Sequence, residues 1–176
     1  NPQLETSMSV RKVVEGNQRS IVAEFELDAS PEAVWAALSD PTEIARWFCL
    51  QARVEGKVGS EIEFNWDPLF DFKWVDQITI WEPNKRLAFA PTKETVEKEG
   101  LAYVCDFVIS TDKGKTKLKM VQSGFTTDAK WDEELESFFG GWNYELTSLW
   151  HYLTYHRGER RDVLWARLNF AELNIE

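Results

Sequence analysis

The sequence predicts an α+β fold in which one antiparallel sheet curves around a long C-terminal α-helix. Apolar residues recur at spacings of three and four from Trp131 to Leu153, which is the pattern of one face of a long helix over residues 130–156. Between residues 21 and 125, short segments alternate apolar and polar side chains, as half-buried strands do. Because only a short segment follows the helix, the sheet is expected to cover the apolar face of the helix.

One strand and two short helices are predicted to open the fold. Alternate positions are apolar over residues 21–27, which predicts the first half-buried strand. Ser30 and Asp40 each precede a proline, and a capping side chain followed by proline is a typical helix start. We therefore expect short helices over residues 31–38 and 41–48.

The chain that follows predicts a meander of hairpins. Alternating patterns predict further strands over residues 62–66, 72–81, 86–90, 101–110 and 116–122. Residues 91–100 are rich in charge and are expected to form an exposed loop.

Within the predicted strand 72–81, strict alternation places Trp74, Asp76, Ile78 and Ile80 on one face and Trp81 on the other.

The chain length of 176 residues fits one domain with two short flanking segments. We expect a tail with a short edge segment at residues 1–19, the main domain at residues 20–157, and a C-terminal extension at residues 158–176. Apolar residues from Val163 to Leu168, including Trp165, predict a short helix in that extension, which could serve dimerisation.

Composition disfavours several classes of partner. The net charge of −10 repels phosphate backbones and anionic lipid surfaces, so neither nucleic acid nor membrane binding is expected. No long apolar run or signal-peptide pattern is present, and a cytoplasmic protein is the expectation. The two cysteines, Cys49 and Cys105, are expected to be buried reduced thiols.

The familiar cofactor and metal motifs are absent. Neither GxGxxG, GxxxxGK[ST] nor HExxH occurs, so no cofactor is expected. His151 and His156 are five residues apart, which on an α-helix places them on different faces and disfavours a metal site.

Polar residues among apolar ones on the helix-facing side of the sheet predict a cavity. Asp76, Tyr103, Cys105 and Gln122 occupy such positions. An unpaired polar group in a dry core costs about 1–3 kcal/mol, so these groups need partners, water or a ligand. Alternatively, the register is shifted by one residue and they face solvent, or they pair with one another.

The candidate lining of this cavity combines aromatic, polar and sulfur-containing side chains. Its members are Phe64, Trp66, Trp74, Asp76, Tyr103, Cys105, Met120, Gln122, Phe139 and Trp142. The glycine pair Gly140-Gly141 interrupts the long helix, and we expect it to let the helix approach the sheet or bend around a bound molecule.

Five separate motifs resemble one known family. They are residues 29–41 with Trp47 after them, Gly56 with Gly59, residues 82–87, residues 115–118 before Ser123-Gly124-Phe125, and Gly140-Gly141-Trp142 with the leucines that follow. Together they resemble the heat-shock protein 90 ATPase activator homologue family of the START-like superfamily, also called SRPBCC or Bet v-like. The similarity covers about residues 21–156 and, within the two-domain activators, only their C-terminal domain.

The resemblance implies a helix-grip fold and three alternative functions. The first is binding of a hydrophobic small molecule between the long helix and the sheet. The second is a cyclase or hydrolase that uses the same cavity, with Asp76 as base and Tyr103 as acid. The third is a stress-related co-chaperone role, in which a chaperone is the partner.

Overall fold

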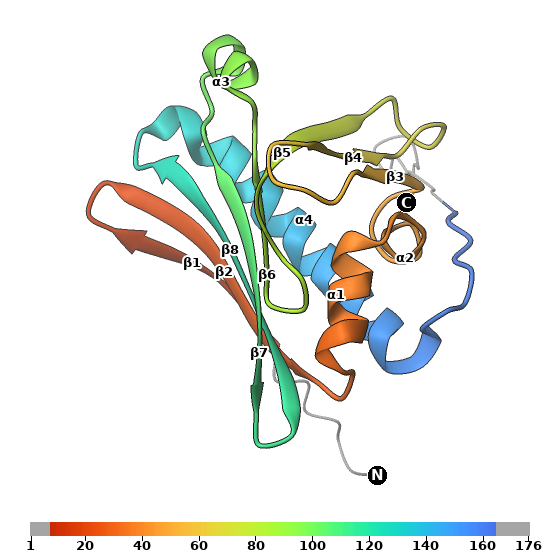
Figure 1. The fold of residues 1–176 in the computed structure, drawn as a ribbon. Helices are drawn as coiled ribbons and strands as arrows, with labels where there is room; N and C mark the ends of the chain where they lie inside the picture. The colour runs from red at the N-terminus through yellow and green to blue at the C-terminus, as the bar shows by residue number, and fades with distance from the viewer. Residues whose placement is uncertain (1–7, 165–176) are drawn as a thin grey trace, which may run out of the picture.

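One curved antiparallel sheet forms the body of the protein. The computed structural model describes residues 8–164. In that part of the chain the sheet has eight strands in the order β1-β2-β8-β7-β6-β5-β4-β3. The strands are β1 (Ser9–Glu15), β2 (Gln18–Leu27), β3 (Gln51–Val54), β4 (Glu61–Asn65), β5 (Lys73–Glu82), β6 (Arg86–Ala90), β7 (Val104–Asp112) and β8 (Lys115–Thr126). Figure 1 shows the sheet curving around the long helix α4, which confirms the predicted α+β architecture.

The helices lie on the concave side and at the ends of the sheet. They are α1 (Pro31–Ser39), α2 (Pro41–Ile44), α3 (Lys93–Glu99) and α4 (Asp132–His151). A 3₁₀ turn (Ala129–Trp131) precedes α4 and a π-helical turn (Tyr152–His156) follows it, so the helix predicted over residues 130–156 is confirmed in three consecutive segments.

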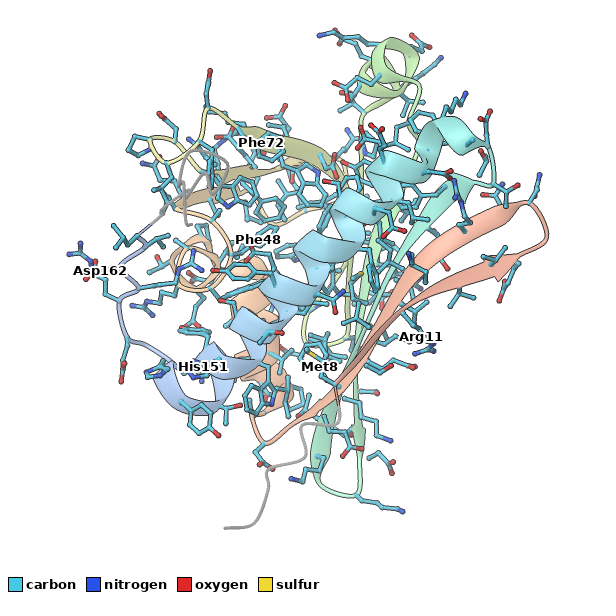
Figure 2. The ribbon with its side chains drawn as sticks, turned by 180° about the vertical axis from the view of Figure 1, so that it is seen from behind. Met8, Arg11, Phe48, Phe72, His151 and Asp162 are labelled. Carbon is cyan, nitrogen blue, oxygen red and sulfur yellow. The ribbon has the colours of Figure 1, made fainter. Side chains whose placement is uncertain are left out.

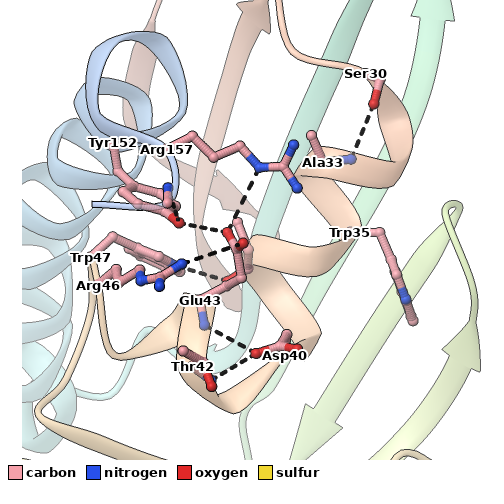
Figure 3. A network of polar contacts seen from close by, with 12 residues as sticks. Ser30, Ala33, Trp35, Asp40, Thr42, Glu43, Arg46, Trp47, Tyr152 and Arg157 are labelled. Atoms are coloured by element: carbon pink, nitrogen blue, oxygen red, sulfur yellow. Dashed lines mark hydrogen bonds and ion pairs between the residues drawn. The ribbon is translucent and has the colours of Figure 1, made fainter. Parts of the chain in front are cut away.

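Both predicted helix starts are confirmed. The Ser30 Oγ accepts a hydrogen bond from the backbone N–H of Ala33 at 3.2 Å. An Asp40 oxygen accepts from the N–H groups of Thr42 and Glu43 at 2.8 and 3.1 Å. These bonds, drawn in Figure 3, satisfy N–H groups that have no partner within the first turn.

A polar network fixes the C-terminal end of α4 against α2. The Tyr152 hydroxyl donates a hydrogen bond to Glu43 Oε2 at 2.6 Å. Arg46 and Arg157 each lie 3.8 Å from an oxygen of the same carboxylate (Figure 3). Glu43 therefore connects α2 with the turn after α4, and this contact sets where the long helix ends over the sheet.

The core lies between the concave face of the sheet and α4. The strands contribute residues at alternate positions, as the sequence predicts, and α4 contributes one apolar stripe. The central members are Ile21, Ala23, Phe25, Leu27, Cys105, Phe107, Ile109, Leu118, Met120, Leu135, Trp142, Leu146 and Leu149. Cys49 and Cys105 are free and buried, and burial raises the pKa of both thiols.

Three elements differ from the sequence-based expectation. Helix α2 ends at Ile44, whereas the prediction extended it to residue 48. The segment 91–100 is not a loop, because Lys93–Glu99 forms α3, with the Thr92 hydroxyl accepting a hydrogen bond from the N–H of Thr95 at 3.2 Å. Gly100 ends this helix in the left-handed conformation, at φ 75°. Strand β3 was not predicted; its four residues pair with β4 at the edge of the sheet.

A β-bulge overturns the face predicted for Trp81. The register of β5 against β6 shifts between Ile78 and Ile80. Because the bulge adds one residue to β5, the side chains after it no longer alternate in phase with those before it, and Trp81 lies on the opposite face from the predicted one. Trp81 pairs with the buried Leu87, and its ring lies 4.9 Å from that of Trp35 on α1.

The two ends of the described chain differ in secondary structure. Residues 9–15 of the expected tail form edge strand β1, which pairs with β2 along its whole length. Val163 and Leu164 of the expected C-terminal helix are in irregular structure, and Trp165 and Leu168 lie outside the described residues.

Candidate functional site

A cavity of about 650 Å³ lies beside the N-terminal half of α4, between that helix, the start of β5 and α3. Eight of its 18 lining residues are aromatic, and four carry carboxyl groups. The residues around it are Phe48, Trp66, Phe72, Lys73, Trp74, Val75, Asp76, Thr95, Glu99, Leu101, Tyr103, Trp131, Glu134, Ser137, Phe138, Gly141, Trp142 and Glu145. Figure 2 labels Phe48 and Phe72, which lie on the side of α4 that faces β3–β5.

Trp74 connects the sheet with α4 at this cavity. Its ring lies 5.7 Å from Phe138 and 6.0 Å from Trp142, both of which come from the helix. Phe48, which follows α2, stacks on Trp142 at 5.8 Å with nearly parallel rings. Such ring contacts are worth about 0.5–1.5 kcal/mol each beyond the area they bury, so the aromatic wall is a stable surface.

Asp76 is the most deeply buried carboxyl group at the cavity, with 1% of the residue exposed. The Trp74 indole N–H donates a hydrogen bond to its Oδ2 at 2.9 Å, and the Tyr103 hydroxyl donates to its Oδ1 at 3.1 Å. Burial nevertheless raises the pKa of Asp76 to about 6, because desolvation outweighs the two hydrogen bonds and the nearby Glu99 charge adds to the rise. Asp76 is therefore mostly ionised at neutral pH.

Tyr103 is a hydrogen-bond donor rather than an acid. Burial, together with the negative charge of Asp76, raises the pKa of its hydroxyl far above the ordinary value. A phenol with a raised pKa holds its proton more tightly, which weakens it as a proton donor to a substrate.

Glu145 places a second, partly buried carboxyl group at the cavity. Its Oε2 is buried and has no hydrogen-bond partner among the described residues. Burial raises the pKa of Glu145 to about 7, although the positive charge of Arg161 opposes the shift. Together with Asp76, Glu99 and Glu134, it surrounds the cavity with acidic groups.

The structure brings five of the sequence-predicted lining residues to the cavity. These are Trp66, Trp74, Asp76, Tyr103 and Trp142. Asp76 and Tyr103, the two candidate catalytic residues, form a hydrogen bond to each other there. The alternative in which they face solvent is thereby excluded, whereas mutual pairing is what the structure shows.

The other five predicted lining residues lie elsewhere. Phe64 packs behind Trp74 with ring centroids 5.7 Å apart, and Cys105 and Met120 are fully buried under α4. Gln122 is also fully buried, and its Oε1 accepts a hydrogen bond from the Trp142 indole at 2.8 Å. Phe139 points away from the cavity towards β1, where the Lys12 ammonium lies 5.0 Å from its ring centre.

Sequence reasoning missed the stripe that faces the cavity on α4 and on the 3₁₀ turn before it. Trp131, Glu134, Phe138, Gly141 and Glu145 follow one another at spacings of three and four. This is the helical period, but the stripe mixes aromatic, acidic and glycine residues and lies beside the purely apolar face. The mixed stripe itself is therefore the signal that could have located the cavity.

The glycine pair is not needed for a close approach of α4 to the sheet, so that alternative is wrong, and the other, that the helix bends around a bound molecule, stays a prediction. A Cβ built on Gly140 or Gly141 would meet no atom within 4 Å. Gly141 lines the cavity and Gly140 does not. The absent side chain at Gly141 therefore leaves open space on the cavity side of the helix.

The two histidines lie closer together than their spacing predicts. The rings of His151 and His156 are 4.8 Å apart, because the π-helical turn brings residues five apart nearer to one face. Even so, the described residues contain no group of three His, Cys, Asp or Glu side chains that could hold a metal ion. Likewise, no helix in residues 8–164 is long and apolar enough to cross a membrane.

Several solved structures share this fold. The Aha1 dimer from Colwellia psychrerythraea superposes with a TM-score of 0.67 at 22% identity, over 79% of this chain and 98% of that one. Protein MLL2253 from Mesorhizobium loti gives a TM-score of 0.61 at 25% identity, over 74% and 93%. CalU16 from Micromonospora echinospora gives 0.61 at 23% identity, over 86% of both chains.

Sequence comparison identifies the family. None of the curated protein sequences matches the chain significantly. The family model described as activator of Hsp90 ATPase homolog 1-like protein matches residues 28–154, which run from the end of β2 to the π-helical turn. This match spans most of the sheet and all of α4, so the chain belongs to the activator of Hsp90 ATPase homolog 1-like family.

Proposed function

We propose that this protein binds an aromatic or otherwise apolar small molecule in the cavity between α4 and β5. The observation that carries the proposal is the cavity of about 650 Å³, with aromatic walls and a buried polar cluster at Asp76. Small-molecule sites typically measure about 300–1,000 Å³ and combine apolar walls with a few polar groups that fix orientation.

The packing around the cavity supports a bound molecule. Protein interiors are normally filled at crystal-like density, and an unfilled apolar space loses contacts on all its sides. Trp74, Phe138 and Trp142 form a wall of rings, whereas Gly141, on the same helix as Phe138 and Trp142, provides no side chain. A ligand placed there would contact the rings that currently border open space.

The adjacent glycines provide a matched test. Gly141→Leu places a side chain in the cavity, and Gly140→Leu makes the same change on the same helix outside it. Binding of the uncharged fluorescent probe N-phenyl-1-naphthylamine should weaken about tenfold or more in Gly141→Leu, a loss of at least about 1.4 kcal/mol. Gly140→Leu should bind as the wild type does. Equal binding by both variants would refute the cavity as the binding site.

Native mass spectrometry complements this test. Protein purified from its own host should carry a small molecule whose mass is retained in wild type and Gly140→Leu but absent from Gly141→Leu. The same spectrum gives the number of subunits, which tests the expected homodimer.

Family membership favours a second candidate, an interaction with a chaperone. The family description names activation of the Hsp90 ATPase, and residues 28–154 match it. The assay is ATP hydrolysis by purified Hsp90 with and without this protein. Stimulation that is equal in wild type and Gly141→Leu would establish a chaperone role independent of the cavity, and absence of stimulation would remove this candidate.

An enzymatic use of the same cavity has less support. Asp76, with a pKa of about 6, suits a general base, but the raised pKa of Tyr103 makes it a poor acid partner. Should a co-purified compound be turned over, Asp76→Asn should abolish the reaction; undiminished turnover would exclude Asp76 as the base.

A further inference from the structure

We propose that the cavity selects positively charged ligands, namely a protonated amine carried on an aromatic or apolar body. This inference rests on the proposed function, because it names the class of molecule that the cavity would hold. It follows from the charges around the cavity, the absence of ion pairs between them and the described basic residues, and the aromatic rings beside them.

The charges around the cavity are unbalanced. Asp76, Glu99, Glu134 and Glu145 border it, and Lys73 is the one basic residue in its described lining. Lys73 lies 3.6 Å from a carboxylate oxygen of a glutamate outside the cavity lining, Glu63, so its charge is already shared.

None of the four carboxyl groups forms an ion pair with a described residue, although the positive charge of Arg161 acts on Glu145. Among the described residues, no Lys, Arg or His lies within 4.0 Å of their oxygens. The charge that acts on Asp76 most strongly belongs to Glu99 and is negative. Asp76 is buried and Glu145 is partly buried, whereas Glu99 and Glu134 are exposed. Because an isolated buried charge is costly, Asp76 and Glu145 are the two groups that a bound cation would stabilise most.

Asp76 is arranged as an anion. Both of its hydrogen bonds come from donors, the Trp74 indole and the Tyr103 hydroxyl, and a carboxylate accepts such bonds without needing a proton. Each oxygen keeps a further acceptor site, since an ionised carboxylate offers about four. A cation in the cavity would lie in the field of this group and gain a charge-assisted interaction.

The aromatic walls suit the same ligand. Cations bind favourably over the faces of Trp, Tyr and Phe rings, with Trp the strongest. Trp66, Trp74 and Trp142 line the cavity together with Phe138. The carboxyl groups and ring faces would hold the ammonium group, and the remaining rings would contact the apolar body. An anion would be repelled by the negative charges around the cavity and should bind more weakly than a neutral ligand.

The test uses three probes that share one naphthalene body. 2-(1-Naphthyl)ethylamine is positively charged near neutral pH, 2-(1-naphthyl)ethanol is neutral and 1-naphthylacetate is negatively charged. Isothermal titration calorimetry with the full chain should show the amine binding about tenfold or more tightly than the alcohol, as a charge-assisted contact predicts. The acetate should bind more weakly than the alcohol.

Two variants and one control assign the preference to the cavity. Asp76→Asn and Glu145→Gln each remove one negative charge from the lining and should lower the amine-to-alcohol affinity ratio several-fold, with little change for the alcohol. Glu133→Gln makes the same charge change on α4 outside the lining and should leave the ratio unchanged.

The pH dependence of the wild type provides a measurement without substitutions. Lowering the pH from about 8 to about 5 should reduce the ratio, because Asp76 and Glu145 take up protons in this range. The other charged groups that line the cavity are Glu99 from α3, Glu134 from α4 and Lys73 from β5, and the positive charge of Arg161 acts on Glu145. Tyr103 and Cys105 are held neutral by their raised pKa values.

The outcomes separate this inference from the proposed function. If amine and alcohol bind equally and Gly141→Leu weakens both, the cavity binds ligands but does not select cations, and the inference fails alone. If neither probe binds and the uncharged fluorescent probe does not distinguish Gly141→Leu from Gly140→Leu, both proposals fail. If Glu133→Gln lowers the amine-to-alcohol affinity ratio as much as Asp76→Asn and Glu145→Gln do, the selectivity arises from the net charge of the protein. That result would overturn the inference.

Discussion

The buried carboxyl group of Asp76 should make the stability of the protein fall as the pH rises, and Asp76→Asn should remove this effect. Burial raises the pKa of Asp76 from 3.8 to about 6. The native protein therefore holds this proton more tightly than the unfolded chain does. As the pH rises through this interval the unfolded chain releases the proton first, so the free energy of unfolding decreases, and the decrease is complete above the folded pKa.

The magnitude follows from the two pKa values. Their separation corresponds to about 3 kcal/mol in total, of which about 2 kcal/mol falls between about pH 4.5 and about pH 8. Asparagine does not titrate, so the stability difference between Asp76→Asn and the wild type should shift by about 2 kcal/mol in favour of the variant over this range. If the amide in the Asp76→Asn variant accepts weaker hydrogen bonds from Trp74 and Tyr103, the resulting loss of stability is the same at both pH values. It therefore cancels when the two pH values are compared.

Urea unfolding followed by tryptophan fluorescence measures this difference at each pH. Asp162→Asn, on a side chain that is 85% exposed, controls for the general effect of removing one carboxylate. Glu145 titrates in the same direction but is present in both proteins, so its contribution also cancels. A stability difference that is the same at both pH values would refute the assignment of a raised pKa to Asp76.

Three further changes should affect stability without reference to a ligand. Gly124→Ala should destabilise the protein by several kcal/mol in a urea titration, because at φ 104° its Cβ would lie 2.1 Å from the Ala102 carbonyl oxygen; a loss below about 1 kcal/mol would contradict this geometry. Trp142→Phe should cost about 1–3 kcal/mol by leaving the buried Gln122 side chain without its partner, and adding Gln122→Met should restore part of the loss; no restoration would show that packing alone is responsible. Ser30→Ala should lower the free energy of unfolding by about 1 kcal/mol through loss of the α1 cap, which thermal denaturation would detect, whereas an unchanged melting temperature would speak against the cap.

The sequence pattern predicted the fold wherever burial alternates with a regular period. Ser30 and Asp40 located two helix starts, and alternation assigned Asp76 and Gln122 to the buried face. Helix α3 was missed because none of its residues is buried, so it has no apolar period. Only the Thr92 cap and the following Gly100 mark it, and these signals are short.

The site was predicted less completely than the fold. Alternation identified which residues of the sheet face α4, but not where the helix and the sheet separate. Under the middle of α4, Cys105 and Met120 are sealed into the core, whereas Trp74 and Tyr103 border open space. That difference depends on the path of the helix over the curved sheet, which no local pattern encodes.

The raised pKa values of Asp76 and Glu145 bear on why the cavity has acidic groups. A buried carboxyl group whose pKa rises by two or more units lowers stability at neutral pH by about 3 kcal/mol, which is a large part of the 5–15 kcal/mol typical of a folded domain. Asn at residue 76 or Gln at residue 145 would keep nearly the same shape without this cost. A fold selected for stability alone would therefore favour the amides, and a compensating interaction would account for the carboxyl groups. A bound cation would supply it, and would raise the stability of the native protein in proportion to its affinity and concentration. Thermal unfolding in the presence of 2-(1-naphthyl)ethylamine should therefore show a larger rise in Tm for the wild type than for Asp76→Asn. An equal rise in both proteins would show that ligand binding does not offset the destabilising effect of the Asp76 carboxylate.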